Sequence, residues 1–247
     1  MSGTSTRLDQ RLVDLSLADS RSRAQAMIKD GSVTVDGVVA DKPSRKVTHS
    51  AAIEVAGDAN PWVSRAALKL IHALDFFDLD PAGAEALDVG ASTGGFTEVL
   101  LARDAACVHA LDVGHGQLHP RVAADPRVRN IEGVNAREIP EGLIPPVDWI
   151  VSDVSFIGLE KALPGPMALA RPGATLVALI KPQFEVGPKN VGKGGVVSDP
   201  SLHGEVRARI RNWLVCCGWS VVGEAESPIT GGDGNREFLI AARRNRA

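Results

Sequence analysis

The sequence predicts an α/β protein: a doubly wound domain with a mainly parallel seven-stranded sheet, whose last strand is antiparallel, preceded by a small α+β domain. Three observations predict this fold class. From residue 64 onward, short apolar runs alternate with helical patterns, which favours parallel strands joined by helices. The run at 85–89 enters a glycine-rich turn and then a helical pattern, a typical opening of a doubly wound fold. The first 57 residues instead hold two short helical patterns and a hairpin.

The N-terminal domain, residues 1–57, is predicted to contain two helices followed by short strands. Leucines recur at helical spacing from Leu8, and Ser20 is a good N-cap for a second helix that Gly31 ends. Asp36-Gly37 between two β-branched runs predicts a type I′ hairpin turn. These elements form a compact module of their own.

The second domain is predicted to span residues 64–247 after a linker at 58–63. The last two strands are joined by a turn-rich loop without room for a crossover helix, so they should pair antiparallel. The predicted strands are 52–55 in the first domain and 85–89, 107–112, 128–132, 148–153, 175–180, 219–226 and 236–242 in the second, with helices at 64–77, 96–103, 159–170 and 202–217.

The glycine-rich turn at 90–95 limits the kind of ligand that it can bind. A dinucleotide fingerprint would need glycine at the position of Ser92, and a P-loop would need lysine at the position of Phe96. Without that lysine the loop is poorly suited to nucleotide phosphates. The turn therefore favours a nucleoside ligand without phosphates, for which S-adenosylmethionine is the obvious candidate. The alternative is a glycine turn that serves packing alone.

Composition excludes some classes of function. A net charge of −3 argues against a basic coat over the whole protein, so any contact with nucleic acid must come from local patches. With no tyrosine and 4% aromatic residues, stacking on bases is not expected to be the main recognition device. Three cysteines without metal-binding spacing indicate a reduced, cytoplasmic chain, and no apolar run approaches the roughly 20 residues of a membrane span.

Acidic residues end the first two strands of the predicted sheet. Asp88 and Asp112 stand where a carboxylate can accept hydrogen bonds from ribose hydroxyls in doubly wound folds. An aspartate after a strand also caps turns, and Asp88 could serve only to organise the glycine loop. We expect Asp112 to bind the ribose of a nucleoside ligand.

Charged residues also mark the later strands. Asp153 ends the fourth strand, and Lys181 ends the fifth, where a buried ammonium is costly unless it is paired. A desolvated lysine beside another cation can serve as a base toward a poor acid such as a ribose hydroxyl. Lys69, on the helix before the sheet, and Glu237, at the start of the last strand, would by themselves be ordinary charges.

Five motifs together resemble the TlyA family over nearly the whole chain. They are Asp88-x-Gly-Ala-Ser-Thr-Gly-Gly-Phe-Thr97, Asp112-Val-Gly114, Asp153-x-Ser-Phe156, Lys181-Pro-Gln-Phe-Glu-Val-Gly187 and Gly194-Gly-Val-Val197. Members of that family are ribosomal RNA cytidine 2′-O-methyltransferases with an S4-like RNA-binding domain and a Rossmann-like, FtsJ-like methyltransferase domain. The resemblance implies a Lys–Asp–Lys–Glu tetrad of Lys69, Asp153, Lys181 and Glu237. Lys181 would be the base, tuned by Lys69 and Asp153 and supported by Glu237.

Further residues are expected to bind the cofactor and RNA. The expected residues around S-adenosylmethionine are Asp88, Gly90, Ala91, Ser92, Thr93, Gly94, Gly95, Phe96, Asp112, Val113, Asn135 and Asp153. The expected RNA-binding residues are Arg7, Arg11, Arg21, Arg23, Lys29, Arg45, Lys46 and Arg65. Asn135 would be equally ordinary in a turn, and the basic residues could simply solvate two small helices. His115 and His119 have the spacing of a metal pair, but no third ligand accompanies them, so no metal is expected.

The expected function is therefore S-adenosylmethionine-dependent 2′-O-methylation of cytidine in ribosomal RNA of the large subunit, and of the small subunit in some members. We expect a monomer whose partner is ribosomal RNA or a ribosomal subunit, with no membrane and no protein partner. The alternatives are a non-catalytic ribosome assembly factor on a methyltransferase fold, a membrane-lytic protein, since the family is often labelled haemolysin, and a small-molecule methyltransferase. The last would have no use for the N-terminal domain.

Overall fold

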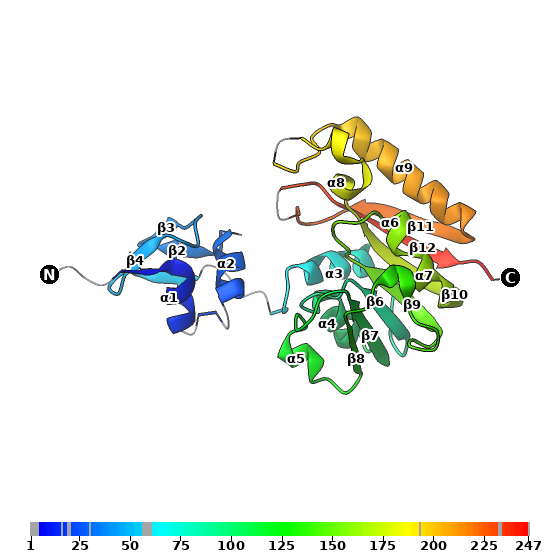
Figure 1. The fold of residues 1–247 in the computed structure, drawn as a ribbon, viewed down its shortest axis with the longest axis horizontal. Helices are drawn as coiled ribbons and strands as arrows, with labels where there is room; N and C mark the ends of the chain where they lie inside the picture. The colour runs from blue at the N-terminus through cyan, green and yellow to red at the C-terminus, as the bar shows by residue number, and fades with distance from the viewer. Residues whose placement is uncertain are drawn as a thin grey trace. The chain divides into compact units, whose positions relative to one another are not determined.

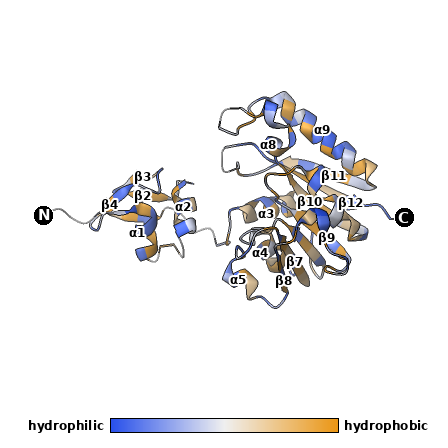
Figure 2. Cartoon of the chain, viewed as in Figure 1, coloured by the Kyte–Doolittle hydropathy of each residue, from blue (hydrophilic) through white to orange (hydrophobic). Residues whose placement is uncertain are grey.

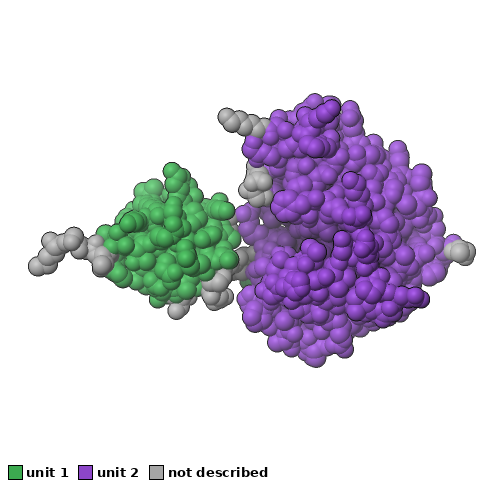
Figure 3. Space-filling view, in the orientation of Figure 1, with its two compact units in different colours: residues 1–61 green, residues 62–247 purple. Residues whose placement is uncertain are grey.

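The computed structural model describes residues 5–15, 17–18, 21–29, 31–55, 61–192, 194–231 and 234–246. The chain divides into two compact units, residues 1–61 and residues 62–247, drawn in green and purple in Figure 3. The predicted helix cap Ser20 and residues 58–60 of the predicted linker lie outside the described residues.

The N-terminal unit is a small α+β domain with its own apolar core. Its elements are β1 (Ser5–Arg7), α1 (Leu8–Asp14), α2 (Arg21–Lys29), β2 (Val33–Val35), β3 (Val38–Val39), β4 (Lys46–Thr48) and β5 (Ile53–Val55). The two helices bury Leu8, Leu12 and Ile28 completely. Asp36 and Gly37 have φ values of 53° and 76°, as the predicted type I′ turn requires. The antiparallel pair of β1 and β4 was not predicted.

The C-terminal unit is built around a twisted sheet with the strand order β11-β12-β10-β9-β6-β7-β8. In the part of the chain that the structure describes, its seven strands are β6 (Glu85–Val89), β7 (Cys107–Asp112), β8 (Val128–Glu132), β9 (Val147–Ser152), β10 (Ala170–Ile180), β11 (Trp219–Glu226) and β12 (Phe238–Arg244). The pairs from β8 to β10 are parallel, and β12 runs antiparallel to both of its neighbours. This topology confirms the predicted fold class.

Helices cover both faces of this sheet (Figure 1). One face packs against α3 (Ala66–Phe76), α4 (Gly95–Ala102) and α5 (Pro120–Ala123), and the other against α6 (Leu159–Ala162), α7 (Pro164–Ala168) and α9 (Pro200–Cys216). The short helix α8 (Pro182–Glu185) follows β10, and 3₁₀ turns span η1 (Ala136–Glu138) and η2 (Pro188–Asn190). Apolar residues concentrate in the strands, whereas α9 carries many polar residues (Figure 2). Two apolar cores, one on each face, hold the layers together.

The predicted helix at 159–170 is wrong. The structure has two short helices there, α6 and α7, and β10 already begins at Ala170. Pro164 is the first residue of α7 and has no backbone N–H to continue the preceding helix. Several predicted strand boundaries also shift, by five residues at the start of β10 and by one or two residues in β5, β9 and β12. Asp153 lies just after β9 and Glu237 just before β12, so both stand outside the sheet.

Candidate active site

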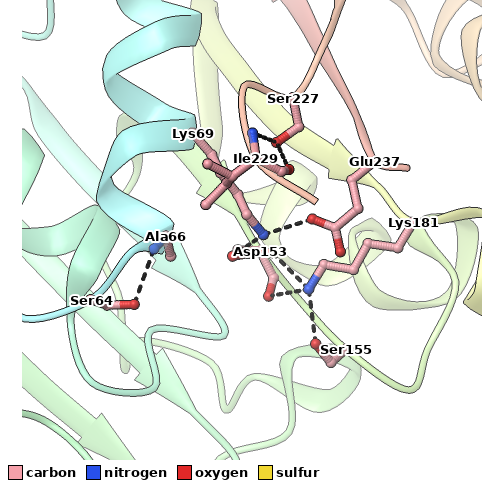
Figure 4. Close-up of polar contacts among 9 residues, drawn as sticks. All are labelled: Ser64, Ala66, Lys69, Asp153, Ser155, Lys181, Ser227, Ile229 and Glu237. Carbon is pink, nitrogen blue, oxygen red and sulfur yellow. Dashed lines mark hydrogen bonds and ion pairs between the residues drawn. The ribbon is translucent and has the colours of Figure 1, made fainter. Parts of the chain in front are cut away.

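Four charged side chains, the tetrad Lys69, Asp153, Lys181 and Glu237, meet at the carboxyl edge of the parallel strands (Figure 4). The Lys69 ammonium lies 2.7 Å from a Glu237 carboxylate oxygen and 3.5 Å from Asp153 Oδ2. The Lys181 ammonium lies 2.7 Å from Asp153 Oδ1. Asp153 therefore stands between the two lysines and contacts each through a different oxygen.

The tetrad is nearly closed off from solvent. Lys69 is 7% exposed, Lys181 8% and Glu237 2%. Two ammonium groups face two carboxylates, so the set can be neutral as a whole, which offsets the cost of burying charge. The sequence alone marked Lys69 and Glu237 as ordinary surface charges, and the fold instead buries both.

The sheet register places three members of the tetrad. Ile180 of β10 pairs with Phe238 of β12, so Lys181 and Glu237, the next residues outward, leave the sheet side by side. Strand β9 lies on the other side of β10, and its last residue pairs with Ala178. Asp153 follows directly and reaches the same place.

The fourth member, Lys69, comes from α3, which approaches the start of α4 closely. A Cβ atom at Gly95 would lie 2.8 Å from Ser64 Cβ and 3.2 Å from the backbone N of Ala67. Only glycine permits this approach. Gly95 therefore also serves to seat the helix that carries Lys69.

Sequence reasoning missed Ser155 as a neighbour of Lys181. The Lys181 ammonium donates to Ser155 Oγ at 2.8 Å and approaches the Asp153 carbonyl oxygen at 3.4 Å. Ser155 belongs to the Asp-x-Ser-Phe motif, so the signal was present, but strand patterns say nothing about a loop residue of this kind.

A cavity of about 540 Å³ lies beside the tetrad, over the ends of β6 and β7. Asp112 is fixed at its rim because Oδ2 accepts from the Ser92 N–H at 2.8 Å and Oδ1 from the Gly114 N–H at 2.7 Å. Asn135 caps η1 by accepting from the Arg137 N–H, so it is both a turn residue and a wall of the cavity. Of the residues expected around the cofactor, the lining includes Gly90, Ser92, Asp112, Val113, Asn135 and Asp153.

A smaller pocket of about 170 Å³ extends from this cavity toward Lys181. Asp88 is fully buried there; its Oδ2 accepts from Thr97 Oγ1 at 2.7 Å, and its Oδ1 has no protein partner. Burial raises the pKa of Asp88 to about 7. Of the residues expected around the cofactor, Asp88, Gly90, Ala91, Ser92, Thr93, Gly95, Phe96 and Asp153 line this pocket. Gly94 instead opens α4 and faces Leu118.

These features fit the polar parts of S-adenosylmethionine. The unpartnered Asp88 oxygen suits an ammonium, and the fixed Asp112 carboxylate suits ribose hydroxyls. Gly90 has a φ of 80°, and a Cβ there would lie 3.0 Å from a Val154 methyl carbon, so the backbone rather than a side chain forms this wall.

An open cleft of about 550 Å³ reaches the tetrad from the other side. Lys69, Lys181 and Glu237 form its floor, and exposed Arg65 lies on its rim. Phe156 is 90% exposed, has a φ of 66°, and stacks at an angle on Phe184 with ring centroids 5.1 Å apart. It borders both the cleft and the cofactor-sized cavity. An exposed ring of this kind can stack on a nucleobase, although the aromatic content gave no such expectation.

The expected RNA-binding residues of the N-terminal unit differ in their surroundings. Arg7 and Arg21 are about half exposed and form ion pairs with Asp9, which is completely buried. Arg11 donates to the His49 carbonyl oxygen. Lys29 and Lys46 are exposed and Arg45 is partly buried, whereas the side chain of Arg23 lies outside the described residues.

One member of the histidine pair, His119, has a structural role. His119 Nδ1 accepts a hydrogen bond from the Arg121 N–H and so caps the N-terminus of α5, a role that needs no metal. Another group, Glu85, Cys107 and His109, brings candidate ligand atoms within 4.8 Å of one another at the amino ends of β6 and β7. His109 Nε2 and Glu85 Oε1 already form a hydrogen bond of 2.5 Å there, on the edge opposite the tetrad.

Comparison with known proteins gives consistent results. A family model described as FtsJ-like methyltransferase matches residues 62–244, and one described as S4 domain matches residues 6–53. The chain is 46% identical over 239 residues to the 16S/23S rRNA (cytidine-2'-O)-methyltransferase TlyA of Mycobacterium tuberculosis, covering 96% of this chain and 89% of that protein. It is 40% identical over 237 residues to hemolysin A of Brachyspira hyodysenteriae, covering 94% and 98%.

A solved structure of a putative hemolysin from Streptococcus thermophilus is also similar, with a TM-score of 0.78 and 35% identity over 99% of this chain and 90% of that one. Two of these relatives carry the name hemolysin. In the described parts of this chain, no helix has the length and apolar composition needed to cross a membrane.

Proposed function

The chain belongs to the FtsJ-like methyltransferases and, within them, to the TlyA family, and on this premise we propose that it transfers the methyl group of S-adenosylmethionine to the 2′-hydroxyl of a cytidine in ribosomal RNA. The observation that carries this proposal is the position of the tetrad. Lys181 lies where the small pocket, lined by the glycine loop, meets the open cleft. A methyl donor bound in the small pocket can therefore meet, at Lys181, a nucleotide bound in the open cleft.

Lys181 is the proposed general base. As a neutral amine it can donate its two hydrogens to Ser155 Oγ and to the Asp153 carbonyl oxygen, next to Asp153 Oδ1, and turn its lone pair toward the cleft. It would take the proton of the 2′-hydroxyl as that oxygen bonds to the methyl carbon and the bond from this carbon to the cofactor's sulfur breaks, leaving a neutral thioether, and it would later release the proton to solvent. The bound cofactor supplies an electrophilic methyl group on a positively charged sulfur.

The other tetrad members orient the base. The Asp153 carboxylate contacts the Lys181 nitrogen through Oδ1. Lys69 contacts the other oxygen of Asp153, and Glu237 in turn pairs with Lys69. Because all four side chains are packed together, the amine is fixed in direction before the substrate arrives. Asp112 would bind the cofactor's ribose, and Asp88 its ammonium.

The N-terminal unit is proposed to bind the RNA. An S4 domain is an RNA-binding module, and Arg7 and Arg21 are held in place by Asp9 with about half of each side chain exposed. Fixed guanidinium groups suit phosphate contacts, which position an RNA without reading its sequence. Arg65 on the cleft rim is proposed to contact RNA next to the target nucleotide.

The test is transfer of labelled methyl from S-adenosylmethionine to unmodified ribosomal subunits and to the RNAs extracted from them. Mass spectrometry identifies the modified nucleotide. We expect 2′-O-methylcytidine, and loss of at least about 10²-fold in rate with Lys181→Ala, the size of a general-base contribution. Lys161→Ala, which removes an exposed lysine on α6, is the matched control and should leave the rate unchanged.

The same experiment separates the alternatives. Cofactor binding without transfer to any RNA would contradict the proposal and favour an assembly factor, whose function Lys181→Ala would not affect. Label in a small molecule instead of RNA would favour a small-molecule methyltransferase. Comparing the two subunits shows which one is the substrate.

A further inference from the structure

One wall of the open cleft consists of two loops that are far apart in the sequence. Val191 and Gly195 line the cleft from the loop after α8, and Ile229, Thr230 and Gly231 line it from the loop between β11 and β12. The first loop is closed on itself, because the Gly192 N–H donates to the Val196 carbonyl oxygen and the Gly195 N–H to that of Gly192. Apart from the 3₁₀ turn η2 in the first loop, the described residues of the two loops have no regular secondary structure.

Asn235 joins these two loops through both ends of its amide. Its Oδ1 accepts from the Val197 N–H at 2.9 Å, and its Nδ2 donates to the Gly195 carbonyl oxygen at 2.9 Å. The side chain is 1% exposed. We call the segment it holds, Gly194–Val197, the wall segment.

A second buried side chain holds the wall segment from α9. His203 Nε2 donates to the Val197 carbonyl oxygen at 2.9 Å, and the imidazole packs against the ring of Phe238. Val197 is thus held through both its N–H and its carbonyl group by side chains from two different elements. Gly194 and Gly195 both have φ values of 82°, so this backbone path is one that other residues would rarely take.

Asn235 is also directly connected to the tetrad. Asn235 and Glu237 are both buried, while Arg236 between them is exposed and pairs with Glu226. The Asn235 carbonyl oxygen accepts from the Gly231 N–H, and a Cβ at Gly231 would lie only 2.6 Å from Glu237 Oε1. One short stretch therefore presents Glu237 to the tetrad and Asn235 to the wall segment.

We propose that Asn235 and His203 are positioning residues for the methyl transfer: together they fix the wall segment relative to the tetrad, so that the target ribose is held against Lys181. This inference rests on the proposed function. Neither side chain reaches the reacting atoms, and neither lines the cofactor-sized cavity. Their loss should therefore affect the use of RNA and leave cofactor binding intact.

The variants Asn235→Ala and His203→Leu remove the hydrogen bonds to the wall segment. Asn235→Asp keeps the acceptor for the Val197 N–H but turns an acceptor toward the Gly195 carbonyl, and His203→Gln keeps an N–H donor in nearly the same place. Asn190→Ala is the matched control, because Asn190 donates to the Val186 carbonyl oxygen in the same loop without touching the wall segment.

We expect kcat/KM for RNA to fall by about 10²-fold in Asn235→Ala and His203→Leu, as for a misplaced substrate, with the Kd for S-adenosylmethionine unchanged. His203→Gln and Asn190→Ala should retain the activity of the unaltered protein. The double variant should lose less than the product of the two single losses, because both act on one segment. Melting temperature and cofactor titration show whether each variant is folded.

Two results would overturn the inference. One is unchanged kcat/KM for RNA in folded Asn235→Ala, Asn235→Asp and His203→Leu. The other is a parallel loss of cofactor affinity, melting temperature and activity in all of them, including His203→Gln, which would indicate support of the fold alone. Failure of the proposed function is a separate outcome, since the unaltered protein would then methylate no RNA.

Discussion

At the scale of single residues, Asp88 makes the proposed cofactor pocket sensitive to pH. Burial disfavours its carboxylate and raises its pKa from 3.8 to about 7. Without a ligand, this group contributes stability that is present below pH 3.8 and is lost as the pH rises through about 7. An ammonium placed at its unpartnered oxygen would favour the ionised form.

The affinity for S-adenosylmethionine should therefore rise by about tenfold between roughly pH 6 and pH 8, because Asp88 changes from mostly protonated to mostly ionised over this range. Calorimetric titration at several pH values measures it. Asp88→Asn should bind more weakly and lose this dependence, whereas Asp78→Asn, at an exposed position after α3, should keep it. An unchanged pH dependence in Asp88→Asn would assign it to another group.

The residue scale also shows why part of the candidate site was not visible in the sequence. Lys181 stood out because it ends an uninterrupted apolar run. The other members of the tetrad were expected only because the motifs resemble those of the TlyA family. Nothing in the helical pattern around Lys69 showed that it faces inward, since this depends on how α3 docks onto α4 through Gly95. Ser155 and Phe156 lie in a loop whose path, with a positive φ at Phe156, is set by tertiary contacts.

At the scale of elements, α1 and α2 are joined through Asp9. Hydrogen bonding by the Arg7 guanidinium, with further bonds from Gln25 and Arg21, holds the pKa of this buried carboxyl well below its usual range. A lowered pKa means that the stabilisation is present above the unfolded-state value, near 3.8, and is lost as the pH falls below it.

Asp9→Asn should destabilise the N-terminal unit by about 1–2 kcal/mol, a modest figure because both arginines are partly screened by solvent. Hydrogen exchange of the α1 and α2 amides at neutral pH measures this loss separately from the methyltransferase unit. The exposed Asp14→Asn in α1 is the control and should have little effect. Equal exchange rates in both variants would show that Asp9 does not join the helices.

The boundaries of strands and helices could be predicted from the sequence where clear turn residues flank an apolar or alternating run. Strands β6, β7, β8 and β11 begin and end at the predicted residues, because each apolar or alternating run is bounded by turn residues. The helix predicted at 159–170 is divided because Pro164 has no backbone N–H to continue it, which apolar spacing alone does not reveal. The pair of β1 and β4 joins residues about 40 positions apart through three-residue strands, too short for a pattern.

At the scale of the whole molecule, charge is divided unevenly between the two parts of the chain. Residues 1–58 hold eight basic and eight acidic side chains, and the rest of the chain therefore carries the full net charge of −3. A negatively charged catalytic part does not attract RNA by its overall field. Binding of the polyanion should then depend on the arranged cations of the N-terminal unit and a few at the cleft, such as Arg65.

Deletion of residues 1–58 should separate cofactor binding from RNA methylation. The tetrad, the cavity, the small pocket, the cleft and both cores of the sheet lie entirely within residues 62–247. The truncated protein should therefore fold and bind S-adenosylmethionine with unchanged affinity. Holding RNA through a second module raises its effective concentration at the active site, so kcat/KM for RNA should fall by about 10²-fold or more. Calorimetry and labelled methyl transfer measure the two quantities, with the full-length protein as reference. Equal kcat/KM in the two proteins would mean that the methyltransferase unit recognises the RNA alone, whereas lost cofactor affinity would mean that the N-terminal unit supports the cofactor site.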